Sequence, residues 1–551
     1  MTLLVQEFLH KIRDDQLRFD GNHANDTGAL ADVVPFDGIG GNPGCPVWQV
    51  AYIVIARQMW KHHGEDVLPS LRQHWVGLLE LMGWFERHAD PEDGLLVTSC
   101  YGDWMGFKPE SGNGGGSLLT PAASVTAFYH VLAMKFLGEI AAALGDPSAS
   151  TWMAKYAKGQ KAYHARFYDF EVGGYSPCKS PPPPPEPRIS CASGSHIDSV
   201  TEGGDNGSCN CAEFCASDWS GNLASKRPHW KGATSLYANT SHDRNVPCVC
   251  VQATHFCPKK GGGGCEAICD KPGTPVAHDF CVPGALPMAE GKCHGTSAHG
   301  SQTSNSMALA LGAPPDTATA QLVAKNLEAD VRNFKNKTTT GVVGIAWLFP
   351  ALDAAGYSGA ALDVLLNDAY PSLGHMAHQN MTTLCENWAC TFHEAGGGSQ
   401  NHIMLGGWNA WLLSSVGGLD SVVNGTTGGW RDIAVRVAPA AVTTIRSSSY
   451  KKLTRFGEIS LDWSYDGGKF TMLLRLPVGT AATVHAPSTL SDGGVTRTVS
   501  SLAEGSQLIW RADGSVAKLV GGVASVAQDQ EAAAVLAQVG SGLYTFEAQY
   551  A

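Results

Sequence analysis

The sequence predicts a mainly helical protein that ends in a smaller β-domain, and two observations of hydrophobic spacing support this. Before residue 176, and again from Ser301 to about Leu419, apolar residues recur at the spacing of helices that bury one face. Beyond Trp430 the apolar residues alternate with polar ones, which is the pattern of half-buried strands. The chain is therefore expected to be helical first and β-structured last.

Two stretches show the helical pattern most clearly. Apolar residues fall on one face from Leu68 to Phe85, and again from Val125 to Leu144. The second helix is expected to end at residues 145–147, Gly-Asp-Pro, because glycine adopts the left-handed conformation that closes a helix and proline cannot continue one. Helix is expected to follow helix, joined by short glycine-rich connections.

The clearest β-element is a hairpin. Apolar residues alternate from Ile459 to Tyr465 and again from Phe470 to Leu476, and the turn sequence Asp-Gly-Gly lies between them at residues 466–468. We therefore predict a β-sandwich over residues 431–551 and a helical domain over residues 1–430.

The helical domain is expected to be interrupted by an insertion over residues 177–298. This segment opens with five prolines at 181–185, which favour a stiff polyproline helix, and it holds 12 of the 16 cysteines of the chain. Such a segment has too few large apolar residues to form a core, so its cysteines favour a disulfide-stapled module. Zinc binding is the alternative for two groups of cysteines, although the paired spacing of common zinc sites is missing: Cys209, Cys211 and Cys215, and Cys248 with Cys250.

Charge and composition narrow the classes of partner. The formal net charge of -12 and the lack of a Lys/Arg-rich run argue against nucleic acid and against an anionic membrane surface. We find no uninterrupted apolar run of about 18 residues, so no transmembrane helix is expected. A neutral ligand suits a chain with this net negative charge better than an anionic partner does.

Cysteine usage and glycosylation motifs favour an extracellular protein or one of the secretory pathway. Six Asn-x-Ser/Thr sites fit a secreted glycoprotein, at Asn25, Asn206, Asn239, Asn336, Asn380 and Asn424. The sequence after Met1 nevertheless carries acidic residues too early for a signal peptide and has the pattern of an amphipathic helix. The chain is thus expected to begin inside a fold.

Seven short segments carry a resemblance to a known family. They are Asp32–Phe36, Pro46–Trp48, Tyr101–Trp104, Gln302–Asn305, Pro371–Met376, Thr382–Trp388 and Ser399–His402. In order and approximate spacing they resemble the bacterial-type α-L-rhamnosidases, glycoside hydrolase family 78, over nearly the whole chain apart from the insertion. The resemblance implies an (α/α)6 toroidal helical barrel, incomplete at its N-terminus, with a C-terminal β-sandwich.

The resemblance also implies an activity. The family releases terminal α-L-rhamnose from rhamnose-containing glycosides or polysaccharides by inversion, without a cofactor or a metal. Inverting hydrolysis uses two carboxyl groups about 6.5–9.5 Å apart, of which one protonates the leaving oxygen and the other activates a water.

By the same resemblance Glu386 is the general base. Its setting between Cys385 and Trp388, at an expected helix start, also suits a group that holds a water, whereas the alternative is an exposed helical glutamate. Cys385 and Cys390 flank it, and they could form a disulfide only if the helix is disturbed there.

Four further residues are expected to bind the sugar. Trp48 and Trp104 match the aromatic walls of the family's rhamnose pocket, and indole faces suit the apolar face and the methyl group of a deoxy sugar. His402 matches a sugar-contacting histidine, and Asp103 is a candidate contact to a hydroxyl group. Without the resemblance, the tryptophans would be interpreted as core residues, the histidine as a cap or core group, and the aspartate as a helix N-cap. The family usually has an acid after the first tryptophan, where this chain has Gln49.

The general acid has no counterpart in the sequence. The family's acid segment would fall before Met1, and Glu80, in a similar short motif, lies within an amphipathic helix and is rejected as a substitute. We therefore expect either a truncated gene model, with the acid segment within roughly 20 codons upstream, or a protein that is inactive as written. A non-catalytic rhamnose- or carbohydrate-binding protein, a secreted matrix or adhesion protein, and another (α/α)6 glycosidase remain as alternatives.

Overall fold

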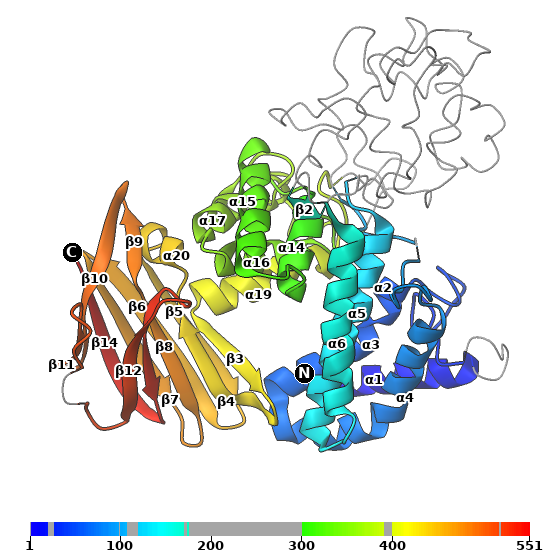
Figure 1. The fold of residues 1–551 in the computed structure, drawn as a ribbon, viewed down its shortest axis with the longest axis horizontal. Helices are drawn as coiled ribbons and strands as arrows, with labels where there is room; N and C mark the ends of the chain where they lie inside the picture. Colours follow the sequence, from blue (N-terminus) through cyan, green and yellow to red (C-terminus); the bar gives the residue numbers. More distant parts are fainter. Residues whose placement is uncertain are drawn as a thin grey trace, which may run out of the picture.

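A computed structural model describes residues 2–19, 27–98, 100–106, 119–169, 173–175, 300–390, 399–516 and 519–551. The predicted insertion 177–298, with its disulfide and zinc alternatives, lies outside these ranges. Figure 1 shows the β-domain on the left, the N-terminal helices on the right, and a second group of helices above and between them.

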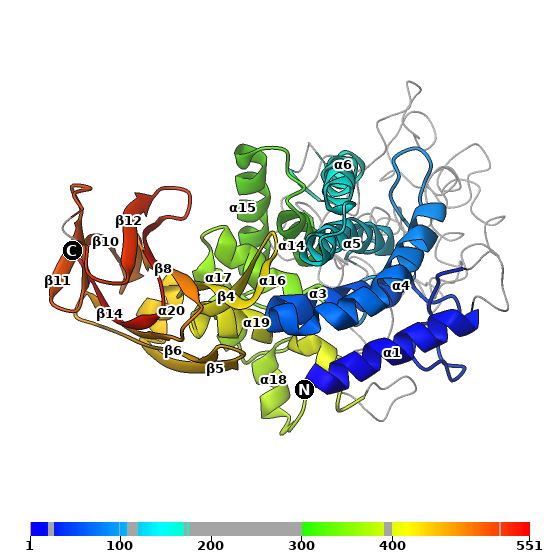
Figure 2. The same cartoon turned by 90° about the horizontal axis from the view of Figure 1, so that it is seen from below.

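The N-terminal helices form the first part of the helical domain. They are α1 (Thr2–Phe19), α2 (Pro46–Gln49), α3 (Ala51–His63), the 3-10 helix η1 (Gly64–Val67), α4 (Leu68–Arg87), α5 (Ala122–Leu144) and α6 (Ala149–Phe167). Helix α1 runs beside α4 and also contacts α3, as Figure 2 shows from below. Two very short strands follow, β1 (Tyr168–Asp169) and β2 (Gly174–Tyr175).

The second group of helices begins at residue 302. It comprises α14 (Gln302–Leu311), α15 (Thr317–Asn333), α16 (Ile345–Ala354), α17 (Ser358–Leu366), α18 (Leu373–His378), the 3-10 helix η6 (Ile403–Trp408), α19 (Asn409–Trp411) and the π-helix η7 (Leu412–Val416). Consecutive helices contact each other in pairs, α5 with α6, α14 with α15, and α16 with α17. This is the hairpin construction expected of a helical barrel.

The end of α5 confirms the prediction made from its sequence. Gly145 has the left-handed φ of 70°, and the backbone N–H of Asp146 donates to the Ala141 carbonyl, which closes the last turn. Helix α5 is long and apolar enough to cross a membrane by length and composition alone, which the sequence analysis did not expect. However, 67% of its most apolar 18-residue window is buried inside the structure, which is typical of the core helix of a globular domain.

The β-domain consists of two packed sheets. Its elements are β3 (Leu419–Asn424), β4 (Thr427–Arg436), the short helix α20 (Pro439–Thr444), β5 (Ser447–Thr454), β6 (Gly457–Asp466), β7 (Lys469–Leu476), β8 (Ala481–Pro487), β9 (Thr489–Asp492), β10 (Val495–Glu504), β11 (Gln507–Arg511), β12 (Val523–Asp529), β13 (Ala534–Val539) and β14 (Gly542–Tyr550). One sheet has the order β11-β10-β14-β7-β6-β5, with β9 beside β10, and the other has the order β12-β13-β8-β4-β3.

The structure confirms the predicted hairpin and sandwich but not the predicted boundary. Strands β6 and β7 pair with Asp466 opposite Lys469, and the turn residues Gly467 and Gly468 both have positive φ, which glycine adopts without steric cost. The first strand of the sandwich, however, begins at Leu419, before the expected boundary at 430. Strand β3 is short and half-exposed, so its apolar alternation is weak.

An ion pair between a partly exposed arginine and a buried aspartate joins the two domains. Arg436, at the end of β4, donates from Nη1 and Nη2 to the two carboxylate oxygens of Asp353 in α16, at 2.8 and 3.0 Å. The Asp353 side chain is 2% exposed and also accepts a hydrogen bond from Trp411 Nε1 at 3.0 Å. A bidentate guanidinium–carboxylate pair fixes both distance and orientation, so it sets how the sandwich meets the helices.

We predict that Arg436→Ala lowers the free energy of unfolding by about 3 kcal/mol, because it leaves a buried carboxylate without its cation. The matched control is Arg431→Ala, which breaks a pair with Glu65 whose side chains are 39% and 52% exposed, and which should cost less than about 1 kcal/mol. Urea unfolding followed by tryptophan fluorescence measures both changes. Equal losses in the two variants would contradict the role given to the Asp353 pair.

Candidate active site

Glu386 lies on an irregular segment and not at the start of a helix, which corrects the expectation from the sequence. Its backbone N–H donates to the Ser399 carbonyl at 2.8 Å, and the N–H of His402 donates to the Leu384 carbonyl at 2.9 Å. The backbone groups that a helix would use are therefore bonded to a second segment. This pairing places His402 beside the segment that carries Glu386.

A disulfide closes the Glu386 segment into a small ring. Cys385 and Cys390 are bonded, with Cα atoms 5.5 Å apart, and both side chains are buried. The sequence left this bond dependent on a disturbed helix, and the structure shows no helix here. The ring limits the positions that the Glu386 backbone can take.

The carboxylate of Glu386 has one partner from a distant part of the chain and one from the adjacent segment. Trp104 Nε1 donates to Oε1 at 3.2 Å, and the backbone N–H of Ser399 donates to Oε2 at 2.8 Å. The side chain is partly exposed. Each carboxylate oxygen has a further lone pair, so the group can still accept a hydrogen bond from a water or a sugar hydroxyl.

The two predicted aromatic walls lie in one row with a tyrosine between them. The ring of Tyr101 is 5.3 Å from that of Trp48 and also 5.3 Å from that of Trp104, between centroids. All three side chains are half-buried. The structure therefore brings together Trp48, Trp104 and Glu386. Tyr101 received no role from the sequence, although it opens the same motif as Trp104.

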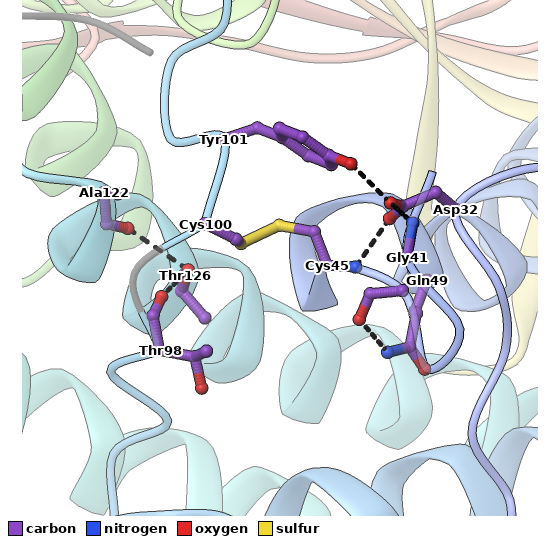
Figure 3. Close-up of a disulfide and its surroundings, with 10 residues drawn as sticks. Asp32, Gly41, Cys45, Gln49, Thr98, Cys100, Tyr101, Ala122 and Thr126 are labelled. Carbon is purple, nitrogen blue, oxygen red and sulfur yellow. Dashed lines mark hydrogen bonds between the residues drawn. A yellow bond between two sulfur atoms is a disulfide. The ribbon is translucent and has the colours of Figure 1, made fainter. Parts of the chain in front are cut away.

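Tyr101, the middle ring of the aromatic row, is held by a partly buried network around Asp32 (Figure 3). Tyr101 Oη donates to Asp32 Oδ2 at 2.7 Å, and the backbone N–H of Cys45 donates to Oδ1 at 2.5 Å. This hydrogen bond to Asp32, with burial as a lesser cause, raises the pKa of the Tyr101 phenol. A disulfide joins Cys45 to Cys100, so the start of α2, which carries Trp48, is tied to the loop that carries Tyr101.

Gln49 occupies the position where the family usually has an acid, and it has a structural role. The side chain is 1% exposed, its Oε1 accepts from the Leu30 N–H at 2.8 Å, and its Nε2 donates to the Gly44 carbonyl at 2.6 Å. Its amide is therefore satisfied inside the fold. The departure from the family pattern at this position does not expose a polar group next to Trp48.

Asp103 is not placed as expected. Its side chain is 0% exposed, and its oxygens accept from the hydroxyl of Thr303 and from the backbone N–H groups of Gly341, Val343 and Gly344. The expectation that Asp103 contacts a sugar hydroxyl is therefore wrong for this structure, because these groups already use the carboxylate. It is also not a helix N-cap, because the segment around it is a turn.

His402 lies at the edge of the site. It is partly buried, and its Nδ1 is buried without a hydrogen-bond partner among the described residues. A buried ring nitrogen without a partner is costly, so this atom suits a hydroxyl group or an ordered water. The next residue, Ile403, is 83% exposed. Within the described part of the chain, no group of three or more His, Cys, Asp or Glu residues is placed to hold a metal ion.

Helical hairpins that present a carboxylate beside indole rings, followed by a β-sandwich, define the class of six-hairpin glycosidases. Comparison with known families agrees. Residues 1–180 and 289–416 match the bacterial alpha-L-rhamnosidase six-hairpin glycosidase domain, and residues 422–500 match the bacterial alpha-L-rhamnosidase C-terminal domain. The chain belongs to the bacterial α-L-rhamnosidase family, as the sequence motifs predicted.

Curated relatives carry the same name over part of the chain. An alpha-L-rhamnosidase of Formosa agariphila is 28% identical over 186 residues, which is 33% of this chain and 19% of that protein. An alpha-L-rhamnosidase of Streptomyces avermitilis is 24% identical over 213 residues, 38% of this chain and 20% of that protein. The matched region thus spans about a fifth of the length of these relatives.

Solved structures share the fold over nearly the whole chain. The alpha-L-rhamnosidase from Dictyoglumus thermophilum superimposes with a TM-score of 0.64 at 20% identity, over 99% of this chain and 43% of that one. The Streptomyces avermitilis alpha-L-rhamnosidase complexed with L-rhamnose gives a TM-score of 0.57 at 17% identity, over 98% of this chain and 36% of that one. These likenesses confirm the helical domain with its C-terminal sandwich.

We predict that the two disulfides stabilise the protein unequally. A cross-link removes more conformational entropy from the unfolded chain when it closes a longer loop, and the pairs are 55 and 5 residues apart. Replacing Cys45 and Cys100 by serine should lower the free energy of unfolding by about 4 kcal/mol, and replacing Cys385 and Cys390 by about 2 kcal/mol. Urea unfolding of the two double variants tests this order. A larger loss of unfolding free energy in the Cys385 and Cys390 variant than in the Cys45 and Cys100 variant would contradict the prediction.

Proposed function

We propose that the site formed by Glu386, Trp48, Trp104 and His402 binds a terminal α-L-rhamnose of a rhamnose-containing glycoside or polysaccharide. The observation that carries the proposal is the hydrogen bond from Trp104 Nε1 to Glu386, which places a carboxylate at the edge of an aromatic row. A deoxy sugar presents an apolar face and a methyl group to indole rings, and its hydroxyls face the polar groups. That a solved relative is complexed with L-rhamnose supports this choice of sugar.

In this proposal Glu386 is the general base of an inverting hydrolysis. Its carboxylate is partly exposed and keeps free lone pairs, so it can accept a proton from a water while that water attacks the anomeric carbon. Trp104 and the Ser399 N–H would hold the carboxylate in place for this step. The Asp32 network would hold the sugar-stacking rings.

An inverting reaction needs a second carboxylic acid to protonate the leaving oxygen. Among the described residues we assign none to this role, because Asp103 is already bonded on both oxygens. A second candidate function for the chain is that of a rhamnose-binding protein without hydrolysis. The two candidates share one site and differ only in whether the bond is cleaved.

We also propose that the protein works outside the cytoplasm. Two disulfides lie in the described residues, and disulfides persist in oxidising compartments. Glycosylation at sites such as Asn424, an exposed residue at the end of β3, would fit this location.

We predict that Glu386→Gln lowers the rate of rhamnose release from an aryl α-L-rhamnoside by at least about 10²-fold and leaves the affinity for L-rhamnose nearly unchanged. Glutamine keeps the size of the side chain and one of its two acceptor oxygens, but it cannot take up a proton. Release of the aryl alcohol measures hydrolysis, and isothermal titration with L-rhamnose measures binding. If the wild type hydrolyses the rhamnoside and Glu386→Gln does so at a similar rate, the general-base role is contradicted. Rhamnose binding without any hydrolysis by the wild type would favour the second candidate.

We predict that Trp48→Ala lowers the affinity for L-rhamnose about tenfold, whereas Trp48→Phe, which keeps an aromatic face, loses less. L-Mannose, which differs from L-rhamnose by a hydroxyl in place of a methyl hydrogen, serves as the matched ligand. The alanine variant should discriminate less between the two sugars. Titration of both sugars against the three proteins tests the stacking role, and equal affinities in all three would exclude it.

A further inference from the structure

The Asp103 carboxylate is the centre of a buried hydrogen-bond network that the proposed reaction does not use directly. Its Oδ2 accepts from Thr303 Oγ1 at 2.5 Å and from the Gly341 N–H at 2.7 Å. Its Oδ1 accepts from the N–H groups of Val343 and Gly344 at 3.1 and 2.8 Å. Four donors on two oxygens fill much of the capacity of a carboxylate, so this group binds the protein and not a ligand.

Three of the four donors, the N–H groups of Gly341, Val343 and Gly344, belong to a turn that leads directly into α16. The fourth donor, the Thr303 hydroxyl, lies in α14. Within the turn the Val342 N–H donates to the carbonyl of Trp104 at 2.8 Å, so backbone and side-chain bonds join the same two segments. The approach is so close that a Cβ at Gly341 would lie 2.2 Å from the Trp104 carbonyl oxygen. The loop that carries Trp104 is therefore fixed to this turn by both packing and hydrogen bonds.

The same turn also holds the segment that carries Glu386. Trp388 Nε1 donates to the Thr340 carbonyl at 2.7 Å, and both side chains are buried. Trp388 stands two residues after Glu386, inside the ring closed by the disulfide. Contacts thus run from Asp103 through the turn to Trp388, on to Glu386, and back through the hydrogen bond from Trp104.

We infer that Asp103 is a positioning residue that fixes Trp104 and Glu386 relative to each other and does not touch the sugar. Its importance for sugar binding rests on the proposed function, whereas the positioning itself does not. Burial raises the pKa of Asp103, and the four donors oppose that shift. A fully buried carboxylate is costly unless it is completely bonded, so its removal disturbs every segment that donates to it.

Two sets of variants test this inference. Asp103→Asn turns one acceptor oxygen into an amide donor that faces existing donors, and Thr303→Val removes one hydroxyl with little change of shape. Thr303→Ser restores the hydroxyl and should restore the wild-type behaviour. Asp353→Asn is the matched control, since it alters an equally buried carboxylate that contacts Arg436 and Trp411 instead of the site.

Hydrogen exchange gives a readout that does not require a ligand. In Asp103→Asn we expect the backbone amides of both 341–344 and 385–390 to exchange about tenfold faster or more. The reason is that losing hydrogen bonds to a charged group lowers the free energy needed for local opening. Thr303→Val should show a smaller change at the same two segments, and Asp353→Asn none there. Unchanged exchange at 385–390 in both Asp103→Asn and Thr303→Val would overturn the inference.

Binding gives the functional readout. L-Rhamnose affinity should fall in Thr303→Val, return in Thr303→Ser, and stay near wild type in Asp353→Asn. In a Trp104→Ala background, Thr303→Val should cause a smaller additional loss than in the wild type, because one of the two residues that Asp103 positions is gone. Equal losses with and without Trp104 would overturn the inference, as would faster exchange without any loss of affinity. A wild type that binds no L-rhamnose would defeat the proposed function, and the exchange result alone would then decide the positioning role.

Discussion

The candidate site depends on one hydrogen bond between residues 282 positions apart in the chain, from Trp104 Nε1 to Glu386. Neither residue lies in a helix, so each must be held by other contacts. An irregular segment has more conformational freedom than a helix, so ordering it costs more conformational entropy. Other contacts must offset this cost. The disulfides, the Asp32 network and the Asp103 network supply the necessary contacts.

The helices and the sandwich are arranged to support these irregular segments. Helix α2 is only four residues long, yet its start is fixed by the Cys45 disulfide and by Asp32, so it presents Trp48 in a defined position. The turn before α16 receives Asp103 and leads to the Asp353–Arg436 pair at the other end of the same helix. Helix α16 therefore begins at the turn that Asp103 holds and ends at the ion pair with Arg436 of the β-domain. Rigid elements that carry functional loops in this way are common in enzymes.

The sequence predicted the regular parts of the protein better than the irregular ones. Helices α4 and α5 and the β6–β7 hairpin have strong periodicity and clear turn residues, and the structure confirms them. The Glu386 segment was interpreted as a helix start because nothing in its local pattern shows that its backbone pairs with residues 399–402. Asp103 was misjudged for a related reason. A residue beside a motif tryptophan can face the site or the core, and only its donors, about 200 or more residues away in the chain, decide which.

Buried carboxylates explain why resemblance alone does not assign roles in this family member. Asp32, Asp103, Asp353 and Glu386 are all acidic groups in or near turns or helix ends, but their partners differ. The first three are enclosed or bonded by donors that leave little for a substrate, and their charge is balanced by N–H groups, hydroxyls or a guanidinium. Glu386 has two donors, remains partly exposed, and stands beside indole rings. Among the described residues Glu386 accepts the fewest hydrogen bonds of these four acids, so it has the most free lone pairs for a water, which is what a base acting on water requires.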